Sequence, residues 1–288
     1  MKRFFVCLVY WVSIQTMAQQ TQNIWLIDVS KAQGDAILAS VKVSDNASYS
    51  NQPHFVDGKN ILLYTQSFTQ GEADQTDAMA YDIEAGNTVN LTQSATSEYS
   101  PTPYKDGFST ILVDSAGKQW LWAFDEKGES IGKLSHAEPV GYHVWLNDTE
   151  ALAFILGQPH TLQRLNLGGS DTVIDENIGA SLWAVPQSDK FSYSKQDQGQ
   201  TLLMAFSPET GDKTQLTVMP AETVYYAWLP DGSAVAGKGS SVLRWSPNSA
   251  QKEWQIWLDL SEQCGEISRL HTRDLDDRIQ VAVVCTDI

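Results

Sequence analysis

The sequence lacks the short motifs that mark the common hydrolases and nucleotide-binding enzymes. Its 288 residues contain neither the G-x-S-x-G turn of serine hydrolases nor the H-E-x-x-H pattern of zinc proteases. They also contain no glycine-rich phosphate loop followed by Lys-Ser or Lys-Thr. No catalytic residue, cofactor or metal ligand is therefore assigned, and the sequence favours a binding protein over an enzyme.

Basic residues are scarce. The chain has 19 Lys and Arg against 35 Asp and Glu, for a net charge of −16. A surface this acidic argues against nucleic acids and anionic membranes as partners. Solubility is the simplest explanation of the charge, and a cation or a basic protein surface is the alternative.

Only three cysteines are present. Cys7 lies inside an apolar run, whereas Cys264 and Cys285 flank a predicted hairpin with strands at 267–273 and 278–284. Folding of that hairpin brings its open ends together, so the two cysteines are predicted to form a structural disulfide. A redox or metal role is disfavoured because no histidine or third cysteine shares the spacing.

No run of apolar residues is long enough to span a bilayer comfortably. The longest, Phe4–Ile14, follows Lys2-Arg3 and precedes the small-residue site Thr16–Ala18. This pattern predicts a signal peptide at 1–18, with an uncleaved anchor as the alternative. The remainder, 19–288, is predicted to be one exported domain with a charge of −18. We expect it to be periplasmic or secreted, monomeric, and not inserted in the membrane once the signal is removed.

A repeat organises the rest of the chain, and Gln52–Gln66 shows its form. Phe55 precedes Asp57-Gly58, and an apolar run, Ile61–Tyr64, follows. Asp-Gly is a turn signal because glycine tolerates positive φ, so the stretch predicts a β-hairpin. An apolar hairpin of this kind needs neighbouring strands to cover its faces.

The hairpin occurs six times along the chain, the first copy included. The residues that correspond to Phe55 are Tyr104, Trp145, Val185, Trp228 and Thr272, at steps of 40 to 49 residues. A second strand pair follows each copy except the sixth, where the chain ends. Strands predicted at 23–28 and 36–43 have the missing shape. The period and the four short strands per unit predict an all-β, six-bladed β-propeller whose last blade is closed by the N-terminal strands.

The first step is the longest because of a polar stretch, Ser67–Asp77, between the second and third strands of that unit. We interpret it as a surface excursion, with a binding loop as the alternative. A separate stretch, Asp114–Trp120, is faintly similar to a sialidase Asp box, but its aspartate stands one position too far from the glycine. It is interpreted as an ordinary turn.

The repeat resembles that of TolB-like propellers. The residues that carry the resemblance are Pro53–Gly58, Tyr81–Ile83 with Gly86, and Leu91-Thr92, with further copies at Ser100–Gly107, Pro208–Gly211 and Trp228–Gly232. The resemblance covers 23–288 and implies a six-bladed propeller. TolB itself is periplasmic, pairs its propeller with an N-terminal α/β domain and takes part in envelope complexes. No room for that domain exists between the signal and the first strand.

The candidate site follows from the propeller geometry, because the first strand of each blade is innermost and the strand starts ring one mouth of the channel. Polar and aromatic residues expected there are His54, Glu98, Tyr99, His143, Trp183, Tyr226, Arg269 and His271, with Glu222 beside them. Such residues could bind a small ligand or a metal. The alternative is that the aromatics pack between blades and the histidines satisfy backbone groups.

Two functions remain open from the sequence. The first is a non-enzymatic, exported propeller that binds a protein or peptide partner in the cell envelope. The second is a propeller that binds a small ligand or a metal at its channel mouth, with a hydrolase or lyase as its enzymatic form. Fold alone does not decide between them.

Overall fold

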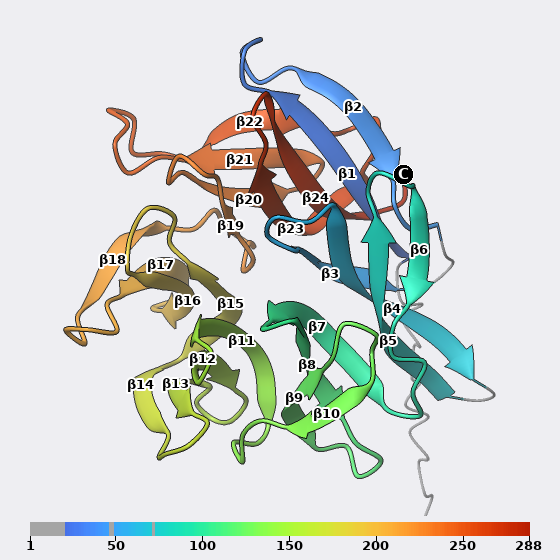
Figure 1. Ribbon diagram of the computed structural model, residues 1–288. Coiled ribbons are helices and arrows are strands. Elements are labelled where there is room, and N and C mark those ends of the chain that lie inside the picture. The colour runs from blue at the N-terminus through green and yellow to red at the C-terminus, as the bar shows by residue number, and fades with distance from the viewer. Residues whose placement is uncertain (1–20, 46–48, 71–72) are drawn as a thin grey trace, which may run out of the picture.

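The computed structural model describes residues 21–45, 49–70 and 73–288. The predicted signal peptide at 1–18 lies outside these ranges. The described chain forms 24 strands in six four-stranded sheets that follow one another around a ring (Figure 1). It is all-β, and within the described ranges no helix could cross a membrane. The predicted six-bladed β-propeller is confirmed.

The strands follow the predicted units closely, and each blade is numbered from its innermost strand. The first blade contains β3 (Ser50–Phe55), β4 (Ile61–Gln70), β5 (Ala73–Asp82) and β6 (Asn87–Asn90). The second contains β7 (Ser97–Tyr104), β8 (Gly107–Val113), β9 (Gln119–Phe124) and β10 (Ser130–Lys133). The third contains β11 (Val140–Asn147), β12 (Glu150–Ile155), β13 (Thr161–Asn166) and β14 (Thr172–Glu176).

The remaining three blades complete the ring. The fourth contains β15 (Ile178–Ala184), β16 (Phe191–Asp197), β17 (Gln200–Phe206) and β18 (Lys213–Val218). The fifth contains β19 (Ala227–Trp228), β20 (Ala234–Lys238), β21 (Ser241–Trp245) and β22 (Gln255–Asp259). The sixth contains β23 (Glu266–Asp274), β24 (Arg278–Thr286), β1 (Gln22–Ser30) and β2 (Ile37–Lys42).

The sixth blade is closed as predicted, by strands from both ends of the chain. Its order is β2-β1-β24-β23, and β1 pairs with β24 over the whole of its length, from Gln22↔Thr286 to Ser30↔Arg278. The predicted disulfide between Cys264 and Cys285 is present, with Cα atoms 5.0 Å apart. The first and last strands of the chain are thus held in one sheet, which closes the ring.

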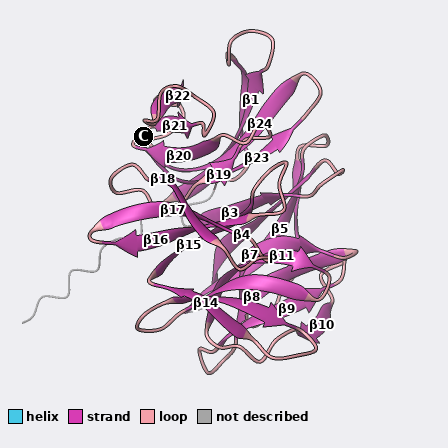
Figure 2. Ribbon diagram, turned by 90° about the vertical axis from the view of Figure 1, so that its left-hand side faces the viewer, coloured by secondary structure: helices cyan, strands magenta, loops and turns pink. Residues whose placement is uncertain are grey.

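The core consists of apolar clusters that lie between neighbouring blades. Figure 2 shows the strands of the blades from the side. One of them joins Phe55, Leu62 and Tyr64 of the first blade to Ile24 and Val284 of the sixth. Both faces of the second and third strands are therefore covered, which explains their continuous apolar runs. The outermost strands are polar or half-exposed. Phe55 packs between blades, at the position where the repeat has its aromatic residues.

Serine hydroxyls fasten some blades together at this same level. Ser192 in β16 accepts hydrogen bonds from Trp228 Nε1 (2.8 Å) and from the Tyr226 hydroxyl (2.9 Å) in the next blade. The equivalent Ser109 in β8 accepts one from Trp145 Nε1 (3.0 Å) and lies 2.7 Å from His143 Nε2. We call these two sets of contacts the serine staples. Each ties an inner strand to the second strand of the preceding blade.

The polar stretch Ser67–Asp77 differs from its prediction. Instead of a surface loop, it extends β4 and β5 into one long hairpin that stays paired from Ile61↔Asp82 to Gln70↔Ala73. Asp77 is buried and accepts a hydrogen bond from Asn90 Nδ2 (2.7 Å). Buried polar partners, invisible to a composition argument, hold this segment as strand.

Two of the Asp-Gly turns use glycine for different reasons. Gly58 has a φ of 70°, and a Cβ there would meet nothing within 4 Å, so it supplies the predicted positive φ. At the second turn, Lys105 takes the positive φ (51°) instead. Gly107 is required because a Cβ would lie 2.2 Å from the Phe124 carbonyl oxygen. The turn at Asp106-Gly107 thus needs its glycine for space and not for positive φ.

Substitution of these glycines should therefore have unequal effects. We expect Gly107→Ala to lower the free energy of unfolding by about 3 kcal/mol, because backbone must move to admit the methyl group. Gly58→Ala should cost about 1 kcal/mol through its positive φ. Gly168→Ala is the matched control, since it has open space and no positive φ. Equal losses for Gly107→Ala and Gly168→Ala in urea unfolding would contradict this assignment.

Candidate functional site: the central channel

The channel holds two hollows that meet at its middle. The smaller has a volume of about 60 Å³ and lies toward the side where the inner strands begin; we call it the start-side pocket. The larger, about 750 Å³, opens among the hairpin turns; we call it the turn-side funnel. His54, Val144 and Trp183 line both, so they form the boundary between the two.

Every inner strand is irregular at the level of the start-side pocket. The pairing of β3, β7, β11, β15 and β23 with the adjacent strand shifts register there, and β19 contains only two residues. Gln52 and Ser100 each have positive φ (58° and 53°), although neither is glycine and each precedes a proline. Such bulges redirect side chains, and strain of this kind gathers at functional sites.

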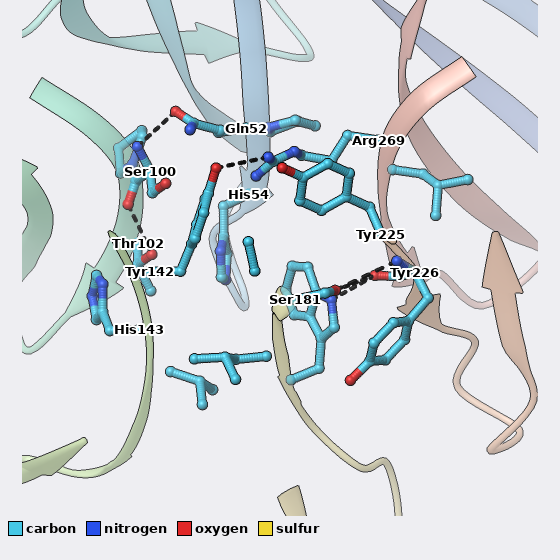
Figure 3. A pocket seen from close by; sticks show the side chains of 17 residues that line it. Gln52, His54, Ser100, Thr102, Tyr142, His143, Ser181, Tyr225, Tyr226 and Arg269 are labelled. Atoms are coloured by element: carbon cyan, nitrogen blue, oxygen red, sulfur yellow. Dashed lines mark hydrogen bonds between the residues drawn. The ribbon is translucent and has the colours of Figure 1, made fainter. Parts of the chain in front are cut away.

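Arg269 of β23 lines the start-side pocket and lies between the side chains of two tyrosines. Its Nη2 donates to the Tyr142 hydroxyl (2.9 Å), and its Cζ lies 3.7 Å from the centroid of the Tyr225 ring. Figure 3 shows Tyr142 and Tyr225 pointing toward the guanidinium. Arg269 Nε is buried without a partner among the described residues. Tyr142, Tyr225 and Arg269 are called the arginine cage below.

The arginine shifts the ionisation of both tyrosines in the cage. Burial would raise the pKa of Tyr142, but the charge of Arg269 and its hydrogen bond outweigh burial, and the pKa falls below its usual value. For Tyr225 burial prevails, and its pKa rises to about 12 despite the same charge. The two tyrosines of the cage thus shift in opposite directions, and Arg269 provides the fixed positive charge beside them.

Three rings form the boundary between the two hollows. The His54 and His271 ring centroids are 4.4 Å apart, and Trp183 stacks on His271 at 4.7 Å. His271 Nδ1 accepts a hydrogen bond from the backbone N–H of Phe55 (2.9 Å). A neutral imidazole that accepts at Nδ1 carries its proton on Nε2, so the free nitrogen of His271 is a donor. This tautomer suits a ligand that accepts hydrogen bonds and does not suit metal coordination.

The structure brings five of the eight predicted site residues to the start-side pocket: His54, His143, Trp183, Tyr226 and Arg269. His271 lines the turn-side funnel instead. His143 and Tyr226 expose only part of their rings there, because their polar atoms belong to the serine staples. Figure 3 shows both rings lying to the sides of the pocket. These two residues fit the alternative given for them, packing between blades.

Glu98, Tyr99 and Glu222 lie outside the pocket. Glu98 is buried on the opposite face of β7, where its Oε1 accepts from Ser94 (2.7 Å) and Thr96 (2.6 Å). Tyr99 lines a separate hollow of about 240 Å³ that also contacts Tyr142. Glu222 is exposed on the loop before β19. The register shifts of the inner strands explain these placements, because each shift changes which residues face the channel.

Gln52, Tyr142 and Tyr225 are among the lining residues that were not predicted from the sequence. Tyr142 and Tyr225 immediately precede His143 and Tyr226, which were predicted to line the channel. Adjacent residues of a strand point to opposite faces, and the sequence alone does not tell which face lines the channel. The one available signal was Gln52-Pro53 and Ser100-Pro101, since proline in a strand marks a bulge or an edge.

The buried histidines predict a pH dependence of stability. Burial lowers the pKa of His54 to about 4 and that of His143 to about 3, and it lowers that of His271 well below its usual value. The unfolded chain takes up these protons near pH 6.5, but the folded protein does not. The stability that these neutral histidines contribute to the folded protein is therefore complete above about pH 6.5 and is lost as the pH falls toward 4.

Between these pH values, each such histidine should lower the free energy of unfolding by up to about 1.4 kcal/mol for each unit by which the pH falls. Urea unfolding at several pH values between 7.5 and 5 would measure it. His54→Gln, which replaces the ring by a group that does not titrate, should reduce the slope by about one histidine's share. A wild-type stability that stays constant over this window would contradict the burial of neutral histidines.

The comparisons with known proteins confirm the fold. No protein-family model matches the sequence, and a search of curated proteins found no relative. Similar solved structures include a putative TolB from Agrobacterium tumefaciens, with a TM-score of 0.68, 11% identity, and coverage of 93% of this chain and 99% of that one. TolB from Acinetobacter baumannii gives 0.59 and 12%, with coverage of 92% and 64%.

A third similar structure is the gluconolactonase XC5397 from Xanthomonas campestris, with a TM-score of 0.58, 12% identity, and coverage of 90% and 94%. The chain thus spans under two thirds of the Acinetobacter TolB but nearly all of the other two proteins. At these identities the likeness shows a shared propeller fold. It includes TolB-like proteins, as the sequence resemblance implied, and it also includes an enzyme.

Proposed function

We propose that this protein is an exported, non-enzymatic propeller that binds one end of a ligand in the start-side pocket of its channel. The observation that carries the proposal is the set of irregular inner strands. Five of the six shift register near one level and the sixth, β19, has only two residues; residues at that level line a single hollow. Strained Gln52 and Ser100 are part of it. A channel that only needed packing would not require this strain.

The size of the pocket restricts what enters it. A cavity needs 10–15 Å³ of this volume for each water molecule, so about 60 Å³ accommodates a group of only a few heavy atoms. Such a group is either a small molecule or the end of a longer chain. The predicted protein or peptide partner in the envelope would therefore present a terminus to the pocket. The disulfide is consistent with an oxidising compartment and so supports a periplasmic or secreted location.

A pair of tryptophan substitutions on β15 tests the proposal. Ala180 lines the start-side pocket, so Ala180→Trp should fill it. Ala184, on the same strand, is exposed and lines the wide turn-side funnel, so Ala184→Trp is the matched control. We expect thermal-shift screening with amino acids, short peptides, sugars and organic acids to yield ligands that bind wild type and Ala184→Trp but not Ala180→Trp. Ligands that bind all three equally would contradict the proposal.

A further inference from the structure

We propose that the group bound in the start-side pocket is a carboxylate, held by the Arg269 guanidinium. The inference rests on the proposed function, because it names the chemistry of the ligand for that same pocket. A free organic acid and the C-terminus of a peptide both present this group. The argument comes from charge, donor geometry and the lining of the pocket.

The charge of Arg269 has no counter-ion among the residues that the structure describes. None of the 17 residues that line the pocket is an aspartate or a glutamate, and no ion pair joins Arg269 to any residue in the described ranges. The chain has a net charge of −16, so a shortage of acidic residues does not explain why none lines the pocket beside Arg269. Removal of a guanidinium from water without a counter-charge is costly, and buried charges are normally paired.

The arginine cage provides only part of what the guanidinium requires. Contacts with the faces of Tyr225 and Tyr142, at 3.7 and 4.9 Å, are cation–π interactions and stabilise the charge without neutralising it. Guanidinium has five N–H donors, and the Tyr142 hydroxyl occupies one of them while Nε has no partner. The cage thus holds the guanidinium in place and leaves donors for a further acceptor.

A carboxylate fits these donors better than other anions do. It is planar, bears a single charge equal to that of Arg269, and accepts two parallel hydrogen bonds from one guanidinium. A phosphate dianion would need a second cation, and the pocket contains no lysine and no other arginine. Leu182, Leu270 and Val144 also line the pocket and would contact a short apolar body attached to the carboxylate. His54 and Trp183 close the pocket beneath it.

Butyrate and its uncharged isostere butyramide are suitable probes, together with the dipeptide Ala-Leu and its C-terminal amide. Thermal shifts of the full-length protein would be compared with sodium chloride as the ionic-strength control. We expect butyrate, Ala-Leu or both to stabilise wild type, and neither amide to do so. If butyrate gives the larger thermal shift, the ligand is a free organic acid; if Ala-Leu does, it is the C-terminus of a peptide. Inorganic phosphate should be inactive.

Substitution of the arginine provides the second arm. Arg269→Met should weaken binding of the acid at least about tenfold, since charge-assisted hydrogen bonds are lost. Arg269→Lys, which keeps the charge but not the fork, should be intermediate. Arg273→Met is the matched control, because Arg273 lies on the same strand but lines the turn-side funnel. It should bind the acid as wild type does.

The outcomes separate this inference from the function on which it rests. Acids and amides that bind equally well, with Arg269→Met unaffected and Ala180→Trp inactive, would overturn the carboxylate while leaving the pocket as the ligand site. Phosphate that binds more tightly than either acid would also overturn it. Wild type that shows no shift with any of the probes would do the same, since the cage is then not a carboxylate site.

Discussion

Ser192→Ala should lower the free energy of unfolding by about 3 kcal/mol, because it removes the acceptor of two buried donors. Trp228 Nε1 and the Tyr226 hydroxyl both donate to Ser192 Oγ, and the Tyr226 side chain is only 1% exposed. Neither donor has water to replace the lost partner. At the usual 2–4 °C per kcal/mol for a chain of this size, the melting temperature should fall by about 6–12 °C.

A control two residues away makes this prediction specific. Ser194 lies on the same strand and is fully buried, yet its hydroxyl has no hydrogen-bond partner among the described residues. Ser194→Ala should therefore be neutral or slightly stabilising. Ser109→Ala, at the equivalent position of another blade, should behave like Ser192→Ala. Equal melting temperatures for the Ser192 and Ser194 variants would show that the serine staples do not hold the blades together.

Loss of the disulfide should cost about as much. The Cys264–Cys285 bond closes a loop with a sequence separation of 21 residues, and the chain-entropy model gives about 3 kcal/mol for a loop of that length. The double variant Cys264→Ala/Cys285→Ala should melt about 6–12 °C below wild type. Because both cysteines are buried in one core cluster, alanine is preferable to serine.

Because of its location, the disulfide should stabilise the sixth blade, which closes the ring, more than the other five blades. Cys285 pairs with Asn23 of β1, so the bond fixes the strand that holds the N-terminal pair in the sixth blade. Hydrogen exchange of the double variant should therefore rise first in β1 and β2. Uniform loss of protection over all six blades would contradict a local role for the disulfide in ring closure.

The sequence predicted the architecture because the repeat is a local signal. Each hairpin carries its own turn residues and apolar runs. The sixth hairpin has no second strand pair after it, which predicted that the N-terminal strands complete the last blade. Phe55 marks the same position in each hairpin, and in the structure it packs between blades. The hairpin extension at Ser67–Asp77 was not predicted because its strands depend on polar partners outside the stretch, such as Asn90.

The candidate site was predictable only in part. Its location in the channel followed from the fold, and Arg269 and Trp183 were named correctly as lining residues. Which of two neighbours faces the channel was not predictable, as the pairs Tyr142-His143 and Tyr225-Tyr226 show. In each pair the first residue belongs to the arginine cage and the second to a serine staple. That choice is set by bulges, which depend on packing around the whole ring.

The arginine cage also predicts an unusual relation between stability and function. A half-buried charge without a counter-ion is destabilising, so its replacement by an apolar residue of similar length is expected to be neutral or stabilising. We therefore expect Arg269→Met to unfold at or above the wild-type temperature while it loses the acid ligand. Retention of so costly a charge is understandable if the pocket needs it for binding.

A crystal structure of the wild-type protein grown with sodium butyrate would test the central claim most directly. We expect a planar carboxylate in the start-side pocket, with both oxygens at hydrogen-bond distance from the Arg269 guanidinium and the carbon chain against Leu182 and Leu270. Butyrate bound only in the turn-side funnel, or a start-side pocket that contains only water at saturating butyrate, would contradict it.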